Sequence, residues 1–212
     1  MTAPQPPEPI LRTLRHVWLA LKPLNIPMAL MGGIALATWK YVRATRDIDL
    51  LLGTADDNPE RLIAVLGASG FRPKRSPPIV RLGQLDLLQL LYEPPETYLD
   101  LQIDLLLAKS DYHRKALERR VPLRLTDLDI DIDVLACEDL ILHKLLAERI
   151  IDLADVAALL GANRKSLDYA YLLNWIEDLG LWPPFRQAWQ AVWPDEPVPK
   201  QTLDTPYMGG VD

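Results

Sequence analysis

The sequence contains few residues that could form a disulfide or a soft-ligand metal site. Its 212 residues include one cysteine, Cys137, and three histidines. A single cysteine excludes an internal disulfide, which agrees with a reducing compartment. Structural zinc sites are usually built from four cysteine and histidine ligands. The sequence therefore gives no indication of a site of that kind.

The sequence also lacks a long apolar run and an excess of positive charge. No run approaches the roughly 18 to 20 apolar residues of a membrane-spanning helix, and the start, MTAPQPPEPI, lacks the basic and apolar regions of a signal peptide. We therefore expect a cytoplasmic protein with no membrane partner. The formal net charge of -6 argues against a protein that coats nucleic acid, although it is compatible with a local basic groove.

The spacing of apolar residues divides the chain into a mixed part and a helical part. Strands and helices alternate in the first two thirds, and helices alone are predicted from Glu138 onward. This order favours an α+β fold, in which a small mixed β-sheet with helices packed on it precedes a C-terminal helical cap. The predicted regions are a disordered tail over 1–9, a core over 10–136, a helical region over 137–193 and a second disordered tail over 194–212. The predicted strands cover 27–31, 47–52 and 128–136, with a hairpin over 85–108, and the core helices cover 10–22, 34–42, 58–70 and 110–120.

The stretch MGGIALATWKYVRATRDIDLLL, residues 31–52, places two aspartates inside an apolar run. Side chains alternate along a strand, so Asp47 and Asp49 would point to the same face. Two neighbouring carboxylates repel each other, and burying them is costly unless cations compensate. Mg²⁺ and Mn²⁺, which prefer oxygen ligands, suit this role. Taken alone, the pattern more often marks an edge strand with a solvated polar face.

Two further features favour the metal interpretation. Gly32 and Gly33 lie between a predicted strand and a predicted helix, where backbone N–H groups can bind a phosphate, although such a pair also forms ordinary tight turns. Asp104, in LQIDLLL, offers a third carboxylate from a neighbouring strand. Three carboxylates can hold two ions about 3.5–4 Å apart against a triphosphate and an attacking oxygen. A second acidic run, residues 127–133, has no glycine pair before it and is interpreted as an exposed strand face.

Two segments carry a resemblance to known proteins. Residues 31–52 resemble the signature of the DNA polymerase β-like nucleotidyltransferase superfamily: a hydrophobic residue, Gly-Gly or Gly-Ser, a dozen or so residues, then Asp-x-Asp. The segment LACEDLILHKLLAERIIDLADVAALL is similar to one in abortive-infection nucleotidyltransferase toxins of the AbiEii type and their uncharacterised relatives. It carries Glu-Asp-Leu, a helical lysine and Asp-x-x-Asp. Together the matches cover roughly residues 25 to 180.

The resemblance implies a role for each matching residue. Asp47 and Asp49 would ligate the metals, and Asp104 would complete the site and help to deprotonate the incoming hydroxyl. Gly32 and Gly33 would hold the β- and γ-phosphates through their backbone amides. Many relatives carry serine in place of Gly33, so a hydroxyl contact to phosphate is absent here. The second segment adds Lys144 as a cation for the triphosphate, with Asp152 and Asp155 either orienting it or contacting the nucleotide.

Several basic residues have two interpretations. Arg43 and Arg46 precede the acids and either bind the nucleotide by neutralising triphosphate charge or only hydrate the loop. Without the resemblance, Lys144 would be interpreted as a surface lysine that extends along an apolar helix. A basic cluster in RPKRSPPIVR is either a solvated loop, which we favour, or a strip for RNA phosphates; it comprises Arg72, Lys74, Arg75 and Arg81.

We therefore expect a metal-dependent nucleotidyltransferase that moves an NMP from an NTP, such as ATP, to an acceptor hydroxyl and releases pyrophosphate. It would use two Mg²⁺ or Mn²⁺ ions. The resemblance to the toxins implies a tRNA end or another RNA as acceptor, and an antitoxin as partner. The acidic balance of the chain suits a small hydroxylated compound instead, as in the related antibiotic nucleotidyltransferases, and a protein hydroxyl is a third option. A hypothesis of another class is a non-catalytic module that binds nucleotide or protein within a toxin–antitoxin pair.

Overall fold

The computed structural model describes residues 8–53, 59–82, 85–95 and 97–199. Most of both predicted tails lies outside this range, and α1 begins at Pro9. The chain divides into two compact units, Met1–Leu140 and Ile141–Asp212, which are described separately. None of the described helices has the length and the apolar content needed to cross a membrane.

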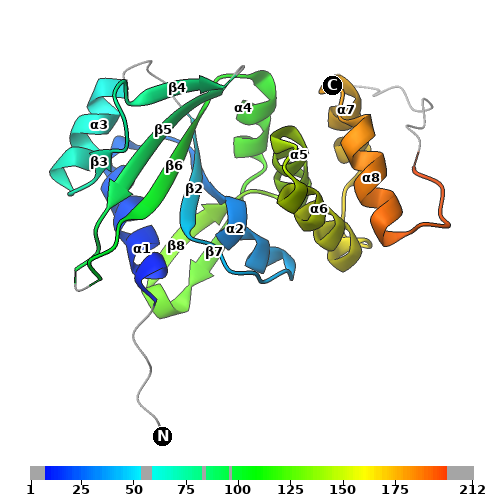
Figure 1. Cartoon of the computed structure of the whole chain (residues 1–212), viewed down its shortest axis with the longest axis horizontal. Helices are drawn as coiled ribbons and strands as arrows, with labels where there is room; N and C mark the ends of the chain where they lie inside the picture. The colour runs from blue at the N-terminus through cyan, green and yellow to red at the C-terminus, as the bar shows by residue number, and fades with distance from the viewer. Residues whose placement is uncertain (1–7, 54–58, 83–84, 96, 200–212) are drawn as a thin grey trace, which may run out of the picture. The chain divides into compact units, whose positions relative to one another are not determined.

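The first unit is built on a mixed sheet (Figure 1). Its strands follow the order β3-β5-β6-β2-β1-β8-β7, and β4 pairs with β5. The central pair β2 and β6 is parallel, whereas β1 and β5 are antiparallel to their neighbours in this pair. The strands are β1 (Met28–Met31), β2 (Asp47–Gly53), β3 (Arg72–Pro73), β4 (Ile79–Leu82), β5 (Leu85–Tyr92), β6 (Leu101–Ala108), β7 (Val121–Leu125) and β8 (Ile130–Val134).

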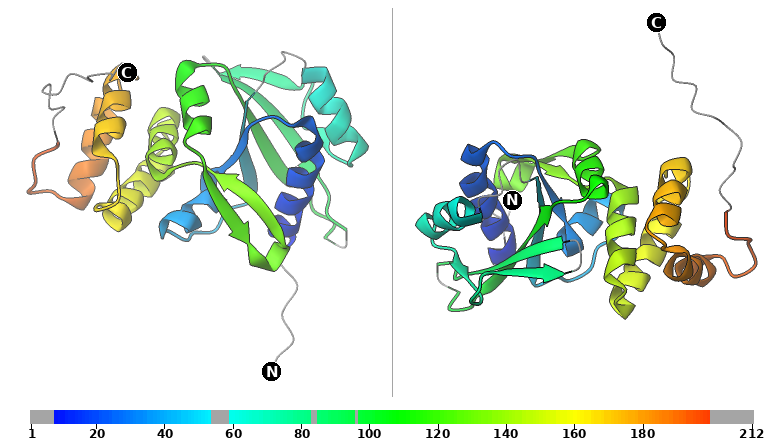
Figure 2. Two further views of the ribbon diagram at one scale, coloured as in Figure 1. Left: turned by 180° about the vertical axis from the view of Figure 1, so that it is seen from behind. Right: turned by 90° about the horizontal axis from the view of Figure 1, so that it is seen from above.

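Helices of the first unit pack on this sheet. Helix α1 contacts α3 and β2, and α4 also contacts β2. Figure 2 shows the same arrangement from two further directions. The helices are α1 (Pro9–Leu21), α2 (Gly32–Ala35), α3 (Pro59–Ala68) and α4 (Asp111–Glu118), with 3-10 turns η1 (Lys22–Leu24), η2 (Leu36–Trp39) and η3 (Thr126–Leu128). Helix α5 (Cys137–Ala147) crosses the boundary between the units.

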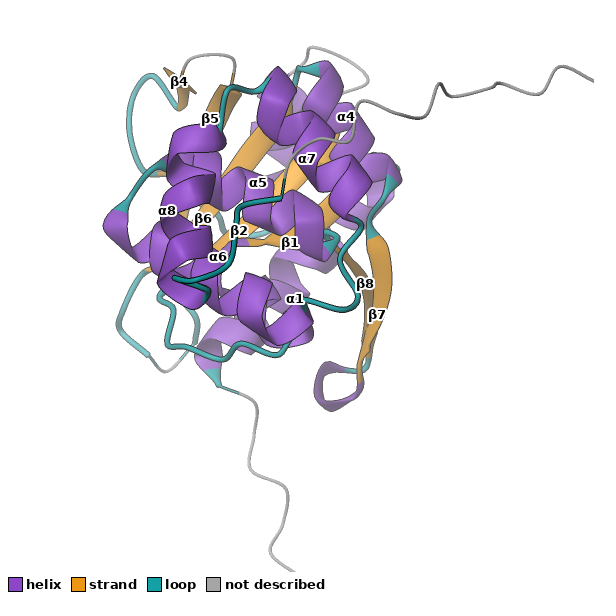
Figure 3. Ribbon diagram, turned by 90° about the vertical axis from the view of Figure 1, so that its right-hand side faces the viewer, coloured by secondary structure: helices purple, strands orange, loops and turns teal. Residues whose placement is uncertain are grey.

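The described part of the second unit contains helices and no strand (Figure 3). Helix α6 (Ile150–Asn163) packs against α8 (Trp182–Val192), which also contacts α7 (Tyr169–Asp178). Phe185 and Trp189 of α8 are buried, and their ring centroids lie 5.9 Å apart. These aromatic side chains therefore pack the helical region.

Strand β2 is the centre of the sheet and not an edge. Ile48, Leu50, Leu51 and Leu52 are fully buried, whereas Asp47 is only partly buried. The strand therefore begins with carboxylates and continues as core on both faces. The edge-strand interpretation of Asp-x-Asp is wrong, because β6 and β1 flank the strand on both sides.

Two parts of the sequence interpretation need correction. The helix predicted over 34–42 is shifted toward the N-terminus and divided: α2 begins at Gly32, and the 3-10 turn η2 ends at Trp39, where Lys40 with a φ of 65° forms the cap. Strand β7 was missed, since a proline such as Pro122 is unusual within a sheet. It lies at the edge of the sheet, where a proline costs no ladder hydrogen bond. The acidic run 127–133 includes exposed Asp131 on β8, as predicted.

His113 of α4 gives the first unit a pH-dependent stability. Burial lowers the pKa of His113 to about 4, while an unfolded histidine titrates at about 6.5. Between these values the unfolded chain binds the proton and the folded chain does not. Stability should therefore fall as the pH drops from about 6.5 to about 4, by up to about 3 kcal/mol. Urea unfolding of wild type and His113→Gln across this window should give a flatter pH dependence in the variant; equal slopes would contradict the prediction.

Candidate active site

Strand pairing brings three carboxylates together. Asp47 and Asp49 share one face of β2, and Asp49 is the register partner of Asp104 on the parallel strand β6. Each of the three residues offers a carboxylate oxygen, and these oxygens lie within 4.8 Å of one another. The predicted convergence is confirmed. Hard oxygen donors at this spacing fit a divalent cation such as Mg²⁺ or Mn²⁺.

The glycine pair lies directly against this cluster. Met31, the last residue of β1, is the register partner of Asp49. Gly32 follows with a φ of 67°, and a Cβ atom there would overlap Oδ2 of Asp49. A Cβ atom on Gly33 would lie 2.5 Å from Oγ1 of Thr45. Both glycines are thus required by the close approach of Asp49 and Thr45, and the turn they form adjoins the carboxylates.

Thr45 precedes β2 and contacts the cluster. Its hydroxyl donates a hydrogen bond of 2.7 Å to Oδ1 of Asp47. Arg46, the next residue, is exposed, and Arg43 is half-buried and donates to the carbonyl oxygen of Ala44 at 3.0 Å. The two arginines thus lie in the segment that leads into β2, and their role in nucleotide binding stays a prediction.

Asp104 is surrounded by amide groups that the sequence interpretation missed. Gln102 donates to both of its oxygens, at 2.8 and 3.0 Å, and Gln89 donates to Oδ1 at 3.1 Å. Burial raises the pKa of Asp104 above its ordinary value; the glutamine hydrogen bonds oppose this rise, and the charge of Asp47 adds to it. A polar residue within the apolar run LDLLQLLY was the available signal for Gln89. The position of Gln102, two residues before Asp104, was the signal for the other amide.

Lys144, Asp152 and Asp155 form an ion cluster in the second unit. The Lys144 ammonium lies 2.9 Å from Asp152 Oδ1 and 2.8 Å from Asp155 Oδ2, and the lysine side chain is only 7% exposed. Arg149 contacts the other oxygen of Asp152 at 2.5 Å. Burial would raise the pKa of Asp152, but the hydrogen bonds from Arg149 and Lys144 outweigh it and lower the pKa. The interpretation of Lys144 as a surface lysine is wrong; its role toward the nucleotide stays a prediction.

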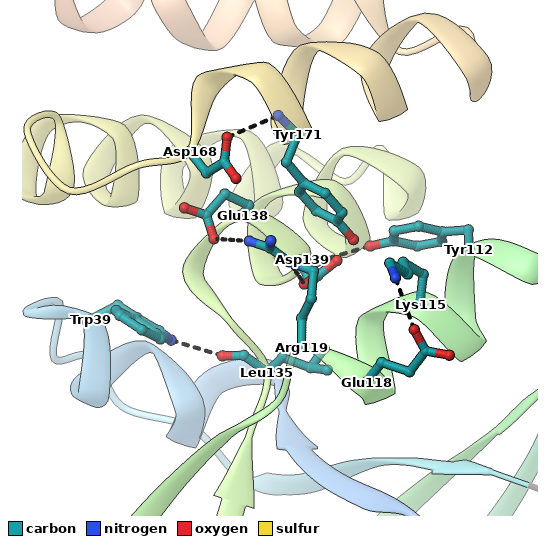
Figure 4. Close-up of polar contacts among 10 residues, drawn as sticks. All are labelled: Trp39, Tyr112, Lys115, Glu118, Arg119, Leu135, Glu138, Asp139, Asp168 and Tyr171. Atoms are coloured by element: carbon teal, nitrogen blue, oxygen red, sulfur yellow. Dashed lines mark hydrogen bonds and ion pairs between the residues drawn. The ribbon is translucent and has the colours of Figure 1, made fainter. Parts of the chain in front are cut away.

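A second set of polar contacts fixes the start of α5 within the first unit (Figure 4). Arg119 lies 3.1 Å from Glu138 and 3.4 Å from Asp139. The Tyr112 hydroxyl donates to the carbonyl oxygen of Asp139 at 3.1 Å. Trp39 donates its indole N–H to the carbonyl oxygen of Leu135 at 3.0 Å, which ties the segment after the glycine turn to the strand end before α5.

Alanine at Gly32 should disturb both the turn and the carboxylate cluster. A positive φ costs a non-glycine residue about 1–3 kcal/mol, and the new methyl group would displace Asp49. We expect Gly32→Ala to lower the free energy of unfolding and to weaken Mn²⁺ binding in calorimetry. Gly67 is a matched control, because a Cβ atom there meets nothing within 4 Å. Gly67→Ala in α3 should stabilise the protein by about 0.5–1 kcal/mol. Equal effects of the two substitutions would contradict this account of Gly32.

The fold of the chain is similar to those of several solved structures. The chain shares 20% identity with an antigenic nucleotidyltransferase-like protein from Paracoccidioides brasiliensis, with a TM-score of 0.48 over 86% of this chain and 93% of that chain. JHP933 from Helicobacter pylori is 15% identical, with a TM-score of 0.49 over 86% of this chain and 79% of that chain. The antibiotic-resistance factor ANT(2'')-Ia is 14% identical, with a TM-score of 0.48 over 86% of this chain and 95% of that chain. Comparison with curated protein sequences gives no match.

The comparison with protein families covers most of the chain. Residues 12–178 match the family described as nucleotidyl transferase AbiEii toxin, type IV toxin–antitoxin system. The match includes all three carboxylates, the glycine pair and the Lys144 cluster. Since it extends over more than half of the sequence, the chain is a nucleotidyltransferase and belongs to the AbiEii toxin family.

Proposed function

We propose that this protein transfers an NMP from an NTP to an acceptor hydroxyl and releases pyrophosphate, in a reaction that depends on divalent metal ions. The observation that carries the proposal is the cluster of Asp47, Asp49 and Asp104 against the glycine turn. We further propose two Mg²⁺ or Mn²⁺ ions as cofactors, because three oxygen ligands at this spacing suit a two-metal site. The divalent ions, when bound, supply positive charge that neutralises the triphosphate.

The carboxylates have separate tasks in this reaction. Asp47 and Asp49 would ligate the divalent ions. The Thr45 hydroxyl fixes the orientation of Asp47. Asp104 accepts the proton of the acceptor hydroxyl as the general base of the reaction. The acceptor oxygen then forms a bond to the α-phosphorus while the bond from that phosphorus to the bridging oxygen breaks, and pyrophosphate leaves.

Other residues are proposed to bind the donor nucleotide. The backbone N–H groups of Gly32 and Gly33 would contact the β- and γ-phosphates, and Arg43 and Arg46 would neutralise triphosphate charge. Lys144, with Asp152 and Asp155, keeps the role that the family resemblance implies, in which the lysine is a cation for the triphosphate.

Loss of single carboxylates tests the proposed reaction. Asp49→Asn and Asp104→Asn should each lower NMP transfer by at least about 100-fold, since charge stabilisation of this kind contributes several kcal/mol. The measurement incubates the protein with each α-labelled NTP, Mg²⁺ and one of three acceptor pools: total RNA, lysate protein or aminoglycosides. Asp131→Asn, on the exposed face of β8, is the matched control and should retain activity.

The outcomes separate the alternatives. Retained transfer in both variants would contradict the assignment. Nucleotide binding without turnover over any acceptor pool would favour a non-catalytic module. The acceptor pool that becomes labelled identifies the acceptor class.

We propose RNA as the acceptor, because two cations, Lys74 and Arg75, bind the glutamines that contact Asp104. Within the basic cluster, Arg72 is paired with Asp100 and Arg81 with Asp86. Lys74 and Arg75 are exposed and bind only neutral amide oxygens of glutamines among the described residues. Their charges are not neutralised by these partners. A phosphate-bearing acceptor suits two such cations, whereas a cationic aminoglycoside does not. The toxin–antitoxin context of the family also agrees with an RNA target, and we propose that a cognate antitoxin limits this activity.

Removal of these charges should weaken RNA binding in a salt-dependent manner. For a single-stranded oligoribonucleotide, Lys74→Met/Arg75→Met should reduce the slope of log K against log salt by about 1.4, that is about 0.7 for each lost phosphate contact. Arg72→Met/Arg81→Met is the matched control, and its slope should change less. An unchanged slope in the first variant would exclude RNA phosphates as partners of Lys74 and Arg75.

A further inference from the structure

Asp104 is held by two amides from two strands. Gln102 precedes it by two residues on β6, so both side chains lie on the same face. Gln89 on the antiparallel strand β5 is the register partner of Asp104. Both amide nitrogens donate to the carboxylate, Gln102 to both oxygens and Gln89 to Oδ1. Asp104 thus receives three hydrogen bonds from groups without charge.

Each of these amides is in turn bound by a cation. Lys74 Nζ donates to the side-chain oxygen of Gln102 at 2.5 Å. Arg75 donates through Nη2 to the side-chain oxygen of Gln89. Two chains of the order cation, amide, carboxylate therefore converge on Asp104. Because lysine and arginine carry donors only, they can bind only the oxygen end of each amide, and the N–H₂ end is left toward Asp104.

The inserted amides change what the cations do to the carboxylate. A lysine in direct contact with Asp104 would neutralise it and compete with a metal ion for the same oxygens. Through a neutral amide, the cation fixes the direction of the hydrogen bond while Asp104 keeps its negative charge. A reversed amide would place its oxygen against the carboxylate, which is electrostatically unfavourable. This arrangement differs from those of Arg72 and Arg81, which bind aspartates directly.

We infer that Gln89 and Gln102 are positioning residues, oriented by Arg75 and Lys74, that hold the Asp104 carboxylate ready for a divalent ion and for the acceptor hydroxyl. This inference rests on the proposed function of the same site.

The test measures Mn²⁺ binding by calorimetry, without nucleotide or acceptor. Gln89→Leu and Gln102→Leu keep the bulk of the side chain and remove the donor, and each should raise the Kd for Mn²⁺ by about 10-fold, as expected for a group that orients a metal ligand. The same variants should lower kcat for NMP transfer with a smaller change in the KM for NTP. Gln187→Leu, on the exposed face of α8, is the matched control and should bind Mn²⁺ as the wild type does.

Two exposed cations provide variants that should not affect folding. Lys74→Met and Arg75→Met should each raise the Kd for Mn²⁺ by about 3-fold, because the amides are then free to reverse. Lys74→Arg, which keeps a donor, should restore wild-type binding, and Arg72→Met should have no effect. A Kd within 2-fold of wild type in both glutamine variants would overturn the inference. An unchanged Kd in both Lys74→Met and Arg75→Met would overturn the orienting role of the cations.

Asp104→Asn separates this inference from the proposed function. If it abolishes Mn²⁺ binding while the glutamine variants bind normally, only the positioning role fails. If Asp104→Asn and Asp49→Asn both bind Mn²⁺ as the wild type does, the metal site itself, and with it the proposed function, is contradicted.

Discussion

The mutual repulsion of three carboxylates on adjacent central strands is the constraint on which the arrangement of the first unit depends. Asp47, Asp49 and Asp104 are only partly exposed, and their neighbours further along the strands are core residues. The sheet thus gathers negative charge that a cation can compensate. In the proposed reaction, binding of the metal–nucleotide complex would supply that positive charge.

The surroundings of the cluster limit this repulsion without removing it. A hydroxyl from Thr45 binds Asp47, and glutamine amides bind Asp104. These donors are neutral, so they leave the negative charges of Asp47 and Asp104 in place. Full neutralisation is found elsewhere, for example where Lys144 and Arg149 contact Asp152 in the second unit. Asp47 and Asp104 are thus held by neutral donors, whereas the buried charge of Asp152 is compensated by cations.

Local sequence patterns were sufficient to predict the centre of the site. Alternation placed Asp47 and Asp49 on one face, and the aliphatic residues around Asp104 marked it as a strand residue, so their convergence could be predicted. The glycine pair was predicted as a turn, but its reason was not, because the overlap with Asp49 and Thr45 depends on the packing of segments that are separate in sequence. The amides were missed for the same reason. The sequence shows that a glutamine lies in a strand, but only the strand register shows which carboxylate the glutamine faces.

The order of these residues along the chain has a consequence for how specificity can diverge. Asp47, Asp49, Thr45 and the glycine turn come from residues 31–49, whereas Asp104 and its four supporting residues come from residues 74–104. Strand pairing between β2 and β6 is what joins the two groups. In the proposed reaction, exchange of the later segment between homologous chains would therefore transfer Asp104 and its supporting residues together, while the residues proposed to bind the donor stay with the recipient chain.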